Sequence, residues 1–345
     1  MRLFDDNGYL DMASIIGTGY PFIFIVGGRG TGKTYGALKY VSENDIFFMY
    51  MRRTQSQIEL VNKDQFNPFN AINEDTGERI RPRPFTKYNS VFERITPAIE
   101  GGEGEQAEPI GYTAALSTIA NMRSFDASAV QVLIYDEFIP EKHERPIKYE
   151  GMALLNAYES INRNRELKGR APLQLVCMAN ANDLANPIFV ELDLVNVAMK
   201  MSDKGQQVRR DNKRGILLIN LQTTPIGQKK QQTALYKLTA ADSEFSRMAI
   251  TNEYSMEEIG QIKPQNLAEY IPIVRVGEIC VYKHKSERRY YICDHVSGSP
   301  DRYTSGQADL MRYRKRYYYL WLAYMENNIY FQNYLTQVLF ERYTK

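Results

Sequence analysis

Short continuous apolar runs, separated by polar stretches, mark the N-terminal half of the chain. They cover residues 21–26 (PFIFIV), 46–51 (IFFMYM), 130–135 (VQVLIY) and 173–178 (LQLVCM). Runs of this length are typical of strands buried on both faces of a parallel sheet. Helices are predicted after the first run, at residues 34–42, and between the third and fourth, at 149–165. The alternation predicts an α/β fold with a doubly wound sheet.

Two segments interrupt this alternation. Residues 99–110 (IEGGEGEQAEPI) are rich in Gly and Glu without an apolar period, which predicts a mobile loop between two short strands. Residues 200–214 contain six Lys or Arg and two Asp, which predicts the start of a linker. The expected organisation is a first domain over residues 1–198, a linker or lid over 199–240, and a small α/β domain over 241–345.

The last of these domains has its own pattern. Residues 278–283 and 289–295 predict a hairpin, and a long aromatic and basic helical stretch follows residue 305, with a break near residues 327–328.

Composition narrows the class of protein. The longest apolar runs have about five or six residues, whereas a transmembrane helix needs about 20, so no membrane span is predicted. Asp5 and Asp6 stand where a secretory signal would need an apolar run. The cysteines, Cys177, Cys280 and Cys293, form no CxxC pair and predict no disulfide framework. A cytoplasmic protein is expected.

A phosphate-binding loop is the strongest chemical signal. Residues 27–34 read GGRGTGKT and fill the pattern GxxxxGK[ST] between a predicted strand and a predicted helix. Glycines let successive N–H groups face one phosphate, the lysine reaches the β- and γ-phosphates, and the threonine hydroxyl faces Mg²⁺. The predicted nucleotide-binding residues here are Gly27, Gly28, Arg29, Gly30, Thr31, Gly32, Lys33 and Thr34. ATP and Mg²⁺ are the cofactors expected.

An acidic pair follows the third predicted strand in the sequence VLIYDEF. Ligands bind at the carboxyl ends of parallel strands, so Asp136 is predicted to hold Mg²⁺ together with Thr34. Glu137 is predicted to orient and polarise the attacking water, as a hydrolase requires. A further strand lies between the two motifs in sequence, which leaves room for the extra central strand of the additional-strand, catalytic-glutamate class (ASCE) of P-loop NTPases.

Three polar residues beyond these motifs are also candidates. Arg163 and Arg165, in SINRNRE, are two positions apart and would point to different faces of a helix. One can form a structural pair with Glu166 or Glu159, and the other can reach a neighbour's γ-phosphate or form an ordinary surface ion pair. Asn180 follows the fourth strand, where it can sense the γ-phosphate or serve in a turn or helix cap.

Basic residues are concentrated towards the C-terminus. The net charge is +2 for the whole chain, but about +5 from residue 275 onwards and about −3 before it. Basic and aromatic side chains alternate over residues 311–319 (MRYRKRYYY), as in nucleic-acid-binding surfaces or in a helix with an aromatic core face and a solvated charged face. The predicted nucleic-acid contacts are Arg209, Arg210, Arg312, Arg314, Lys315 and Arg316.

Together these motifs are similar to a known family. GGRGTGKT, IFFMYMRRT, VLIYDEF, NRNRE, MANANDLANP and the closing aromatic and basic helix occur in the same order as in the DNA-packaging ATPases (encapsidation proteins) of small protein-primed tailed bacteriophages, which are related to large terminase subunits. The resemblance implies an ASCE ATPase domain and a C-terminal domain like an RNase H-like terminase nuclease that has lost its active site. The hairpin sequence agrees, since Asp294 is its only acid between residues 279 and 295 apart from Glu287 in the turn.

The resemblance also implies an assembly and partners. Such proteins form a homomeric ring, usually a pentamer, that docks on the capsid portal (connector) and translocates double-stranded DNA into a preformed capsid. Some members also bind a packaging RNA. Arg163 matches the arginine finger, Asn180 the coupling motif, and Arg53, from the RR pair after the second strand, is added to the nucleotide-binding residues. The expected location is the host cytoplasm, transiently at the procapsid portal vertex, and not the mature virion.

Three alternatives remain at the sequence level. They are a P-loop kinase, a helicase, and a nucleotide-stabilised nucleic-acid-binding scaffold without motor activity. Glu137 and the basic second domain favour a hydrolase over a kinase.

Overall fold

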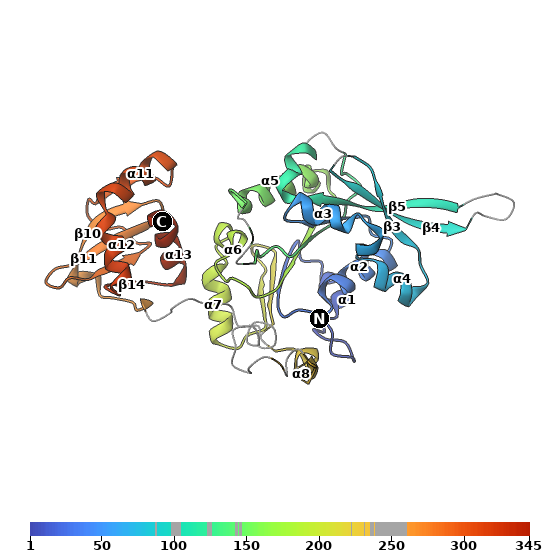
Figure 1. Cartoon of the computed structure of the whole chain (residues 1–345), viewed down its shortest axis with the longest axis horizontal. Helices are drawn as coiled ribbons and strands as arrows, with labels where there is room; N and C mark the ends of the chain where they lie inside the picture. The colour runs from blue at the N-terminus through green and yellow to red at the C-terminus, as the bar shows by residue number, and fades with distance from the viewer. Residues whose placement is uncertain are drawn as a thin grey trace. The chain divides into compact units, whose positions relative to one another are not determined.

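The computed structural model of the chain describes all residues except 87, 98–104, 123–125, 142–143, 145–146, 222, 231, 235–237 and 239–260. The chain divides into two compact units, which are described separately (Figure 1). Unit 1 comprises Met1–Leu192 and Ala198–Ser255, and unit 2 comprises Asp193–Val197 and Met256–Lys345. Within the described residues, no helix is both long and apolar enough to cross a membrane.

A nine-stranded sheet forms the centre of unit 1, in the order β3-β4-β5-β2-β6-β7-β1-β9-β8. Its strands are β1 Phe22–Val26, β2 Phe48–Arg52, β3 Ile80–Pro84, β4 Ser90–Pro97, β5 Glu105–Ala115, β6 Val132–Asp136, β7 Gln174–Ala179, β8 Val208–Asp211 and β9 Ile216–Asn220. The run from β5 to β9 is parallel, and β7 lies between β6 and β1. The four strands predicted from apolar runs are therefore confirmed, and all four are central.

Helices cover both faces of this sheet. They are α1 Met12–Ile16, α2 Lys33–Glu43, α3 Gln55–Val61, α4 Asn70–Thr76, α5 Glu150–Asn162, α6 Pro187–Glu191, α7 Val195–Asp203 and α8 Pro225–Lys230, with short 3₁₀ turns at Asp64–Phe66, Leu116–Met122 and Glu166–Lys168. Ile23 and Ile25 of β1 join a buried cluster with α1, α2 and α4, which lie together in Figure 1. Phe24, on the opposite face, contacts Phe189 of α6 at 6.0 Å between ring centroids. Burial on both faces explains the uninterrupted apolar runs.

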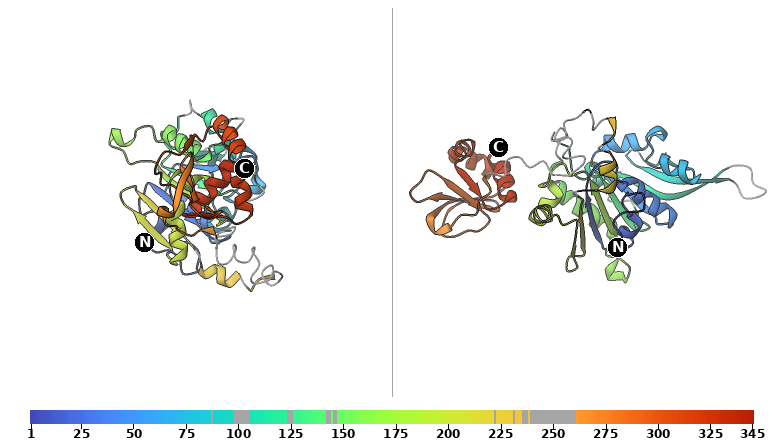
Figure 2. Two further views of the ribbon diagram at one scale, coloured as in Figure 1. Left: turned by 90° about the vertical axis from the view of Figure 1, so that its left-hand side faces the viewer. Right: turned by 90° about the horizontal axis from the view of Figure 1, so that it is seen from below.

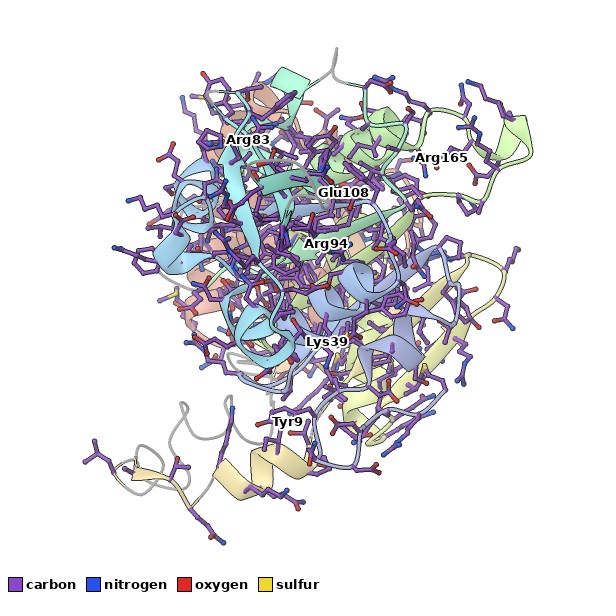
Figure 3. All side chains as sticks on the ribbon, turned by 90° about the vertical axis from the view of Figure 1, so that its right-hand side faces the viewer. Tyr9, Lys39, Arg83, Arg94, Glu108 and Arg165 are labelled. Carbon is purple, nitrogen blue, oxygen red and sulfur yellow. The ribbon has the colours of Figure 1, made fainter. Side chains whose placement is uncertain are left out.

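The predicted loop over residues 99–110 is partly a strand. β5 has 11 residues and begins at Glu105, and its pairing with β4 extends from Val91↔Tyr112 to Pro97↔Glu105. Residues 99–104 lie outside the described residues. Figures 1 and 2 show the two strands running out from unit 1 as a ribbon, and Figure 3 labels the register partners Arg94 and Glu108 on it. Residues 105–109 are all exposed, so no apolar alternation reveals the strand.

The predicted linker over residues 199–240 also needs correction. It contains β8 and β9, and β9 pairs in parallel with β1 from Phe22↔Ile216 to Val26↔Asn220. Unit 1 therefore continues past residue 198 and includes β8, β9 and α8. Two of the basic residues in the predicted linker, Arg209 and Arg210, are exposed on the edge strand β8, and the basic stretch as a whole obscured the buried strand that follows it. Residues 222, 231, 235–237 and 239–240 of the predicted linker lie outside the described residues.

Unit 2 is a small α/β unit with a five-stranded sheet in the order β13-β10-β11-β12-β14. Its elements are a 3₁₀ turn at Leu267–Glu269, β10 Tyr270–Val276, β11 Ile279–His284, β12 Tyr290–Cys293, β13 Asp301–Tyr303, α11 Gln307–Arg316, α12 Tyr318–Met325, β14 Ile329–Phe331 and α13 Tyr334–Thr344. The predicted hairpin is confirmed as β11–β12, with Cys280 opposite Cys293. The predicted helical break is also present, because α12 ends at Met325 and Asn327 adopts φ 57°.

Candidate functional site

The loop between β1 and α2 has the backbone conformation that a phosphate-binding turn requires. Gly30 and Gly32 adopt φ values of +64° and +87°, which side chains with a Cβ rarely adopt. A Cβ at Gly27 would lie 2.8 Å from the Leu221 side chain. The first turn of α2 follows at Lys33, so the unpaired N–H groups of the helix start point towards the same turn. The motif thus has the strand–loop–helix context predicted for it.

The acidic pair and the loop meet at the carboxyl edge of the sheet. Thr34 Oγ1 donates a hydrogen bond of 3.0 Å to Asp136 Oδ2, the last residue of β6. The Tyr50 hydroxyl, from β2, donates to the same oxygen at 2.7 Å. Both motifs open onto a cleft of about 360 Å³. Its lining residues are Arg29, Gly30, Thr31, Gly32, Lys33, Thr34, Tyr35, Asp136, Glu137, Ala179 and Asn180.

Lys33 lies within the loop and is buried. Its ammonium group donates to the carbonyls of Gly27 at 3.0 Å and Gly28 at 2.7 Å. It also lies 3.3 Å from Asn180 Oδ1, so the structure places Asn180, at the end of β7, beside the phosphate-binding lysine. Burial lowers the pKa of Lys33 to about 8, although the carboxylates of Asp136 and Glu137 oppose the shift.

Glu137 directly follows β6 and adopts φ 54°. Its carboxylate forms an ion pair with Arg52, whose guanidinium also lies 3.3 Å from Asp136 Oδ2. Burial raises the pKa of Glu137, and the charge of Arg52 opposes that shift. Arg52 was not among the predicted site residues. The signal for it was the RR pair at the end of the second strand, which did not show which arginine faces the acidic pair.

Arg53 points away from the cleft, which corrects the prediction that it contacts nucleotide. Its side chain has no exposed surface. Its Nε lies 2.7 Å from Glu150 Oε1, and its Nη1 lies 2.9 Å from Glu144 Oε2. The Tyr135 hydroxyl donates to Glu150 at 3.1 Å. Successive residues at the end of a strand point to opposite faces, so Arg53 ties β2 to the start of α5 while Arg52 faces the acidic pair.

Arg163 and Arg165 lie at the other edge of the sheet. Arg165 is buried and donates to the carbonyls of Ser128, at 3.0 Å, and Val130, rather than pairing with Glu166 or Glu159. Arg163 follows the end of α5, and its side chain is 42% exposed and 3.3 Å from Asp126. Asp126, Ser128 and Val130, which these two arginines contact, all precede β6. The strand itself spans about 13 Å from its first residue to Asp136, at about 3.3 Å per residue. Arg163 is therefore far from the cleft of its own chain.

The predicted nucleic-acid contacts are divided between the two units. Arg209 and Arg210 are exposed at successive positions of β8, so they point to opposite faces of the sheet. In unit 2, Arg312 pairs with Asp309 at 2.6 Å and Arg316 with Asp301 at 2.9 Å, while Lys315 is exposed. Arg314 donates to the Tyr343 carbonyl at 2.9 Å and to that of Arg342 at 3.2 Å. Both hydrogen bonds connect α11 to the end of α13, and the contact of Arg314 with nucleic acid stays a prediction.

The family match and the related sequences both point to viral DNA packaging proteins. Residues 5–264 match the family described as podovirus DNA encapsidation protein (Gp16). The DNA packaging protein of Bacillus phage phi29 is 28% identical over 177 residues, which are 50% of this chain and 46% of that protein. That of Bacillus phage B103 is 25% identical over 236 residues, which are 67% of this chain and 63% of that protein. The chain thus spans about half to just under two thirds of these relatives.

Two solved structures share the fold. The bacteriophage Phi-29 viral genome packaging motor assembly aligns with 100% of this chain and 100% of its own, at a TM-score of 0.66 and 18% identity. The Phi-28 gp11 DNA packaging motor aligns with 97% of this chain and 96% of its own, at a TM-score of 0.62 and 18% identity. Because the family match covers well over half of the chain, this protein belongs to the podovirus DNA encapsidation protein (Gp16) family, as its motifs predicted.

Proposed function

We propose that this chain hydrolyses ATP and uses the hydrolysis to move double-stranded viral DNA into a preformed capsid, as a subunit of a homomeric ring. The observation that carries the proposal is the meeting of the phosphate loop and the acidic pair, with Thr34 Oγ1 3.0 Å from Asp136 Oδ2. DNA packaging as the process is inferred from the family, since the related phage proteins are named DNA packaging proteins. The position of β7 between β6 and β1 supports the ASCE class.

The donor set in the cleft fits Mg²⁺. A hydroxyl and a carboxylate are the hard oxygen ligands that this ion prefers, usually together with substrate phosphates. Thr34 and Asp136 would hold it, and when bound it would supply positive charge next to the phosphate oxygens. The N–H groups of the loop and the start of α2 bind the phosphates, and the Lys33 ammonium group reaches them from within the loop.

Glu137 is the group placed to activate water. It follows Asp136 at the edge of the cleft, and burial raises its pKa, which makes the carboxylate a better proton acceptor. The water oxygen attacks the γ-phosphorus, the bond from that phosphorus to the β–γ bridging oxygen breaks, and the water proton passes to Glu137. Arg52 pairs with the same carboxylate, so Glu137 must turn from Arg52 towards the water before it can act.

Arg163 is proposed to act on the nucleotide of a neighbouring subunit, since it lies at the opposite edge of the sheet from its own cleft. A cation at the γ-phosphate is worth about 10³ to 10⁵ in rate where such arginines have been studied. We therefore expect Arg163→Ala to lower DNA-stimulated phosphate release by about 10³-fold or more. In wild type, activity per chain should rise with protein concentration as rings form.

Mixing two inactive variants tests action between subunits. Arg163→Ala and Glu137→Gln should each be inactive alone, and an equimolar mixture should regain hydrolysis at interfaces that combine an intact Glu137 with an intact Arg163. Arg170→Ala, an exposed arginine seven positions away, is the control and should retain wild-type activity. Full activity of Arg163→Ala, or a wild type indifferent to both DNA and concentration, would refute the ring motor.

The pKa of Lys33 predicts a pH dependence of ATP binding. Its charged form binds phosphate, and its pKa of about 8 means that the charge is lost as the pH rises through that value. The dissociation constant for ATP should therefore increase about tenfold per pH unit above about pH 8. Titrations between pH 7 and pH 10 would measure it. Lys33→Arg keeps its charge over this range, so a pH dependence that persisted in this variant would assign the effect to another group.

Unit 2 completes the proposal as the part that binds nucleic acid or the portal, with a packaging RNA as a further partner. We propose that it is a nuclease-like domain without nuclease activity, since two-metal cleavage needs several converging carboxylates. In the part of the chain that the structure describes, no three His, Cys, Asp or Glu side chains are grouped to hold a metal ion. A plasmid cleavage assay with Mg²⁺ or Mn²⁺ tests this, and metal-dependent nicking would contradict it.

The ring would work as a pentamer at the portal vertex in the host cytoplasm and be absent from the mature virion.

A further inference from the structure

Helix α8 is held beside the phosphate loop by the topology of the sheet. It follows β9, which runs parallel to β1, so the two strands end at the same edge. Leu221 comes directly after β9 and lies against Gly27, the first residue of the loop. The Thr224 hydroxyl accepts a hydrogen bond of 3.0 Å from the Gly227 N–H and stabilises the start of α8.

The N-terminal segment supports the same helix from another side. Lys229 donates to the Asn7 carbonyl at 3.3 Å. A Cβ at Gly8, which has φ +91°, would lie 2.8 Å from the Pro225 Cβ, so the two backbones are in close contact. A Cβ at Gly32 of the loop would lie 3.2 Å from the Tyr9 Cβ, so the same segment also packs against the loop. The position of α8 is thus fixed by residues far apart in sequence.

Lys230, the last residue of α8, contacts the phosphate loop itself. Its ammonium group donates to the Arg29 carbonyl and lies against the backbone of Gly30. Lys33 occupies the carbonyls of Gly27 and Gly28. Two ammonium groups therefore lie on one short loop. Burial lowers the pKa of Lys230, and its charge contributes to the lowered pKa of Lys33. Both ammonium groups would be stabilised by an anion in the loop.

The part of the loop next to Lys230 faces the segment that carries the acidic pair. The Arg29 guanidinium forms an ion pair with Glu141, four residues after Glu137. Glu137 must reach the water that attacks the terminal phosphate, so that phosphate has to lie on this side of the loop. Lys230 is therefore at the terminal-phosphate end rather than at the nucleoside end.

We propose that Lys230 is a further nucleotide-contacting residue, which leaves the Arg29 carbonyl to bind the terminal phosphate of a nucleoside triphosphate. This inference rests on the proposed function of the cleft. A triphosphate presents one more phosphate group than a diphosphate, so Lys230 makes the site favour ATP over ADP.

Nucleotide binding to the full chain tests the proposal without relying on turnover. Dissociation constants for ADP and for a non-hydrolysable ATP analogue would be measured by calorimetry for wild type, Lys230→Ala, Lys230→Gln, Lys230→Arg and Lys229→Ala. Lys230→Ala should weaken binding of the ATP analogue by about 10- to 100-fold, because it removes a charge-assisted hydrogen bond to the terminal phosphate. ADP binding should change by less than about twofold, because ADP lacks the phosphate concerned. Lys230→Gln should behave like Lys230→Ala while keeping a side chain that can bind the Arg29 carbonyl.

Two variants separate charge at this position from general effects on α8. Lys230→Arg should restore most of the preference for the triphosphate. Lys229→Ala removes the neighbouring lysine, which contacts Asn7 rather than the loop, and should keep the wild-type ratio between the dissociation constants for ADP and the analogue. Equal losses for both nucleotides in Lys230→Gln, or none, would overturn the inference and leave the proposed function intact. A wild type that bound neither nucleotide would refute the proposed function itself, and the role of Lys230 with it.

Discussion

Replacing Glu137 with Gln is expected to lower ATP turnover by about 10² to 10⁴-fold, the usual contribution of a general base. The amide cannot accept the proton of the attacking water. The phosphates would be held by the loop N–H groups and Lys33, with Thr34 and Asp136 on Mg²⁺, so binding of ATP should change little. Single-turnover phosphate release, with and without double-stranded DNA, would measure the first effect, and equilibrium binding of ATP the second.

The matched control for this prediction is Glu141→Gln. Glu141 lies on the same segment, four residues later, and its carboxylate pairs with Arg29, whereas that of Glu137 pairs with Arg52. Its replacement should leave turnover within about threefold of wild type, as expected for a partly exposed ion pair. If Glu137→Gln turned over ATP at the wild-type rate, another group would have to activate the water, and the proposed assignment of the acidic pair would be wrong.

Replacing Arg53 with Met is expected to destabilise unit 1 by about 3 to 5 kcal/mol, the range found when one partner of a buried ion pair is removed. Among the described residues, Glu150 would keep only the Tyr135 hydroxyl as a partner, and Glu144 would lose its ion pair with Arg53 while keeping its hydrogen bond from Gln57. Urea unfolding followed by circular dichroism, compared with wild type, would measure the loss. ATP binding under native conditions should stay close to wild type, because Arg53 does not line the cleft.

Two comparisons make this prediction specific. Adding Glu150→Gln to Arg53→Met removes the buried negative charge and should recover part of the lost stability. Arg52→Ala, one residue away, should cost less stability because its side chain is 18% exposed and its partners lie at the edge of the cleft. If Arg53→Met unfolded like wild type but no longer bound ATP, Arg53 would be a nucleotide contact after all, as the sequence motif had predicted.

The sequence determined the parts of this protein that depend on local chemistry. The backbone conformation of the phosphate loop could be predicted from the sequence GGRGTGKT, because Gly30 and Gly32 adopt positive φ values that residues with a Cβ disfavour. The central strands are readable because both of their faces are buried, which leaves continuous apolar runs. The position of Asp136 and Glu137 could be predicted as well, because they come at the end of such a strand and ligands bind at the carboxyl ends of parallel strands. The family resemblance rested on these local motifs and is confirmed.

Only the tertiary structure decided the contacts between distant segments. The choice between Arg52 and Arg53 depended on which side chain meets Glu137 and which meets Glu150, 97 residues from Arg53. Lys230 reaches a carbonyl 201 residues away, and no spacing in the sequence encodes that pairing. β9 has a buried apolar run like those of the other central strands, but the basic stretch before it hid that signal, and only the assembled sheet shows that β9 pairs with β1. Local patterns report propensity and burial, whereas long-range pairing depends on how the whole sheet assembles.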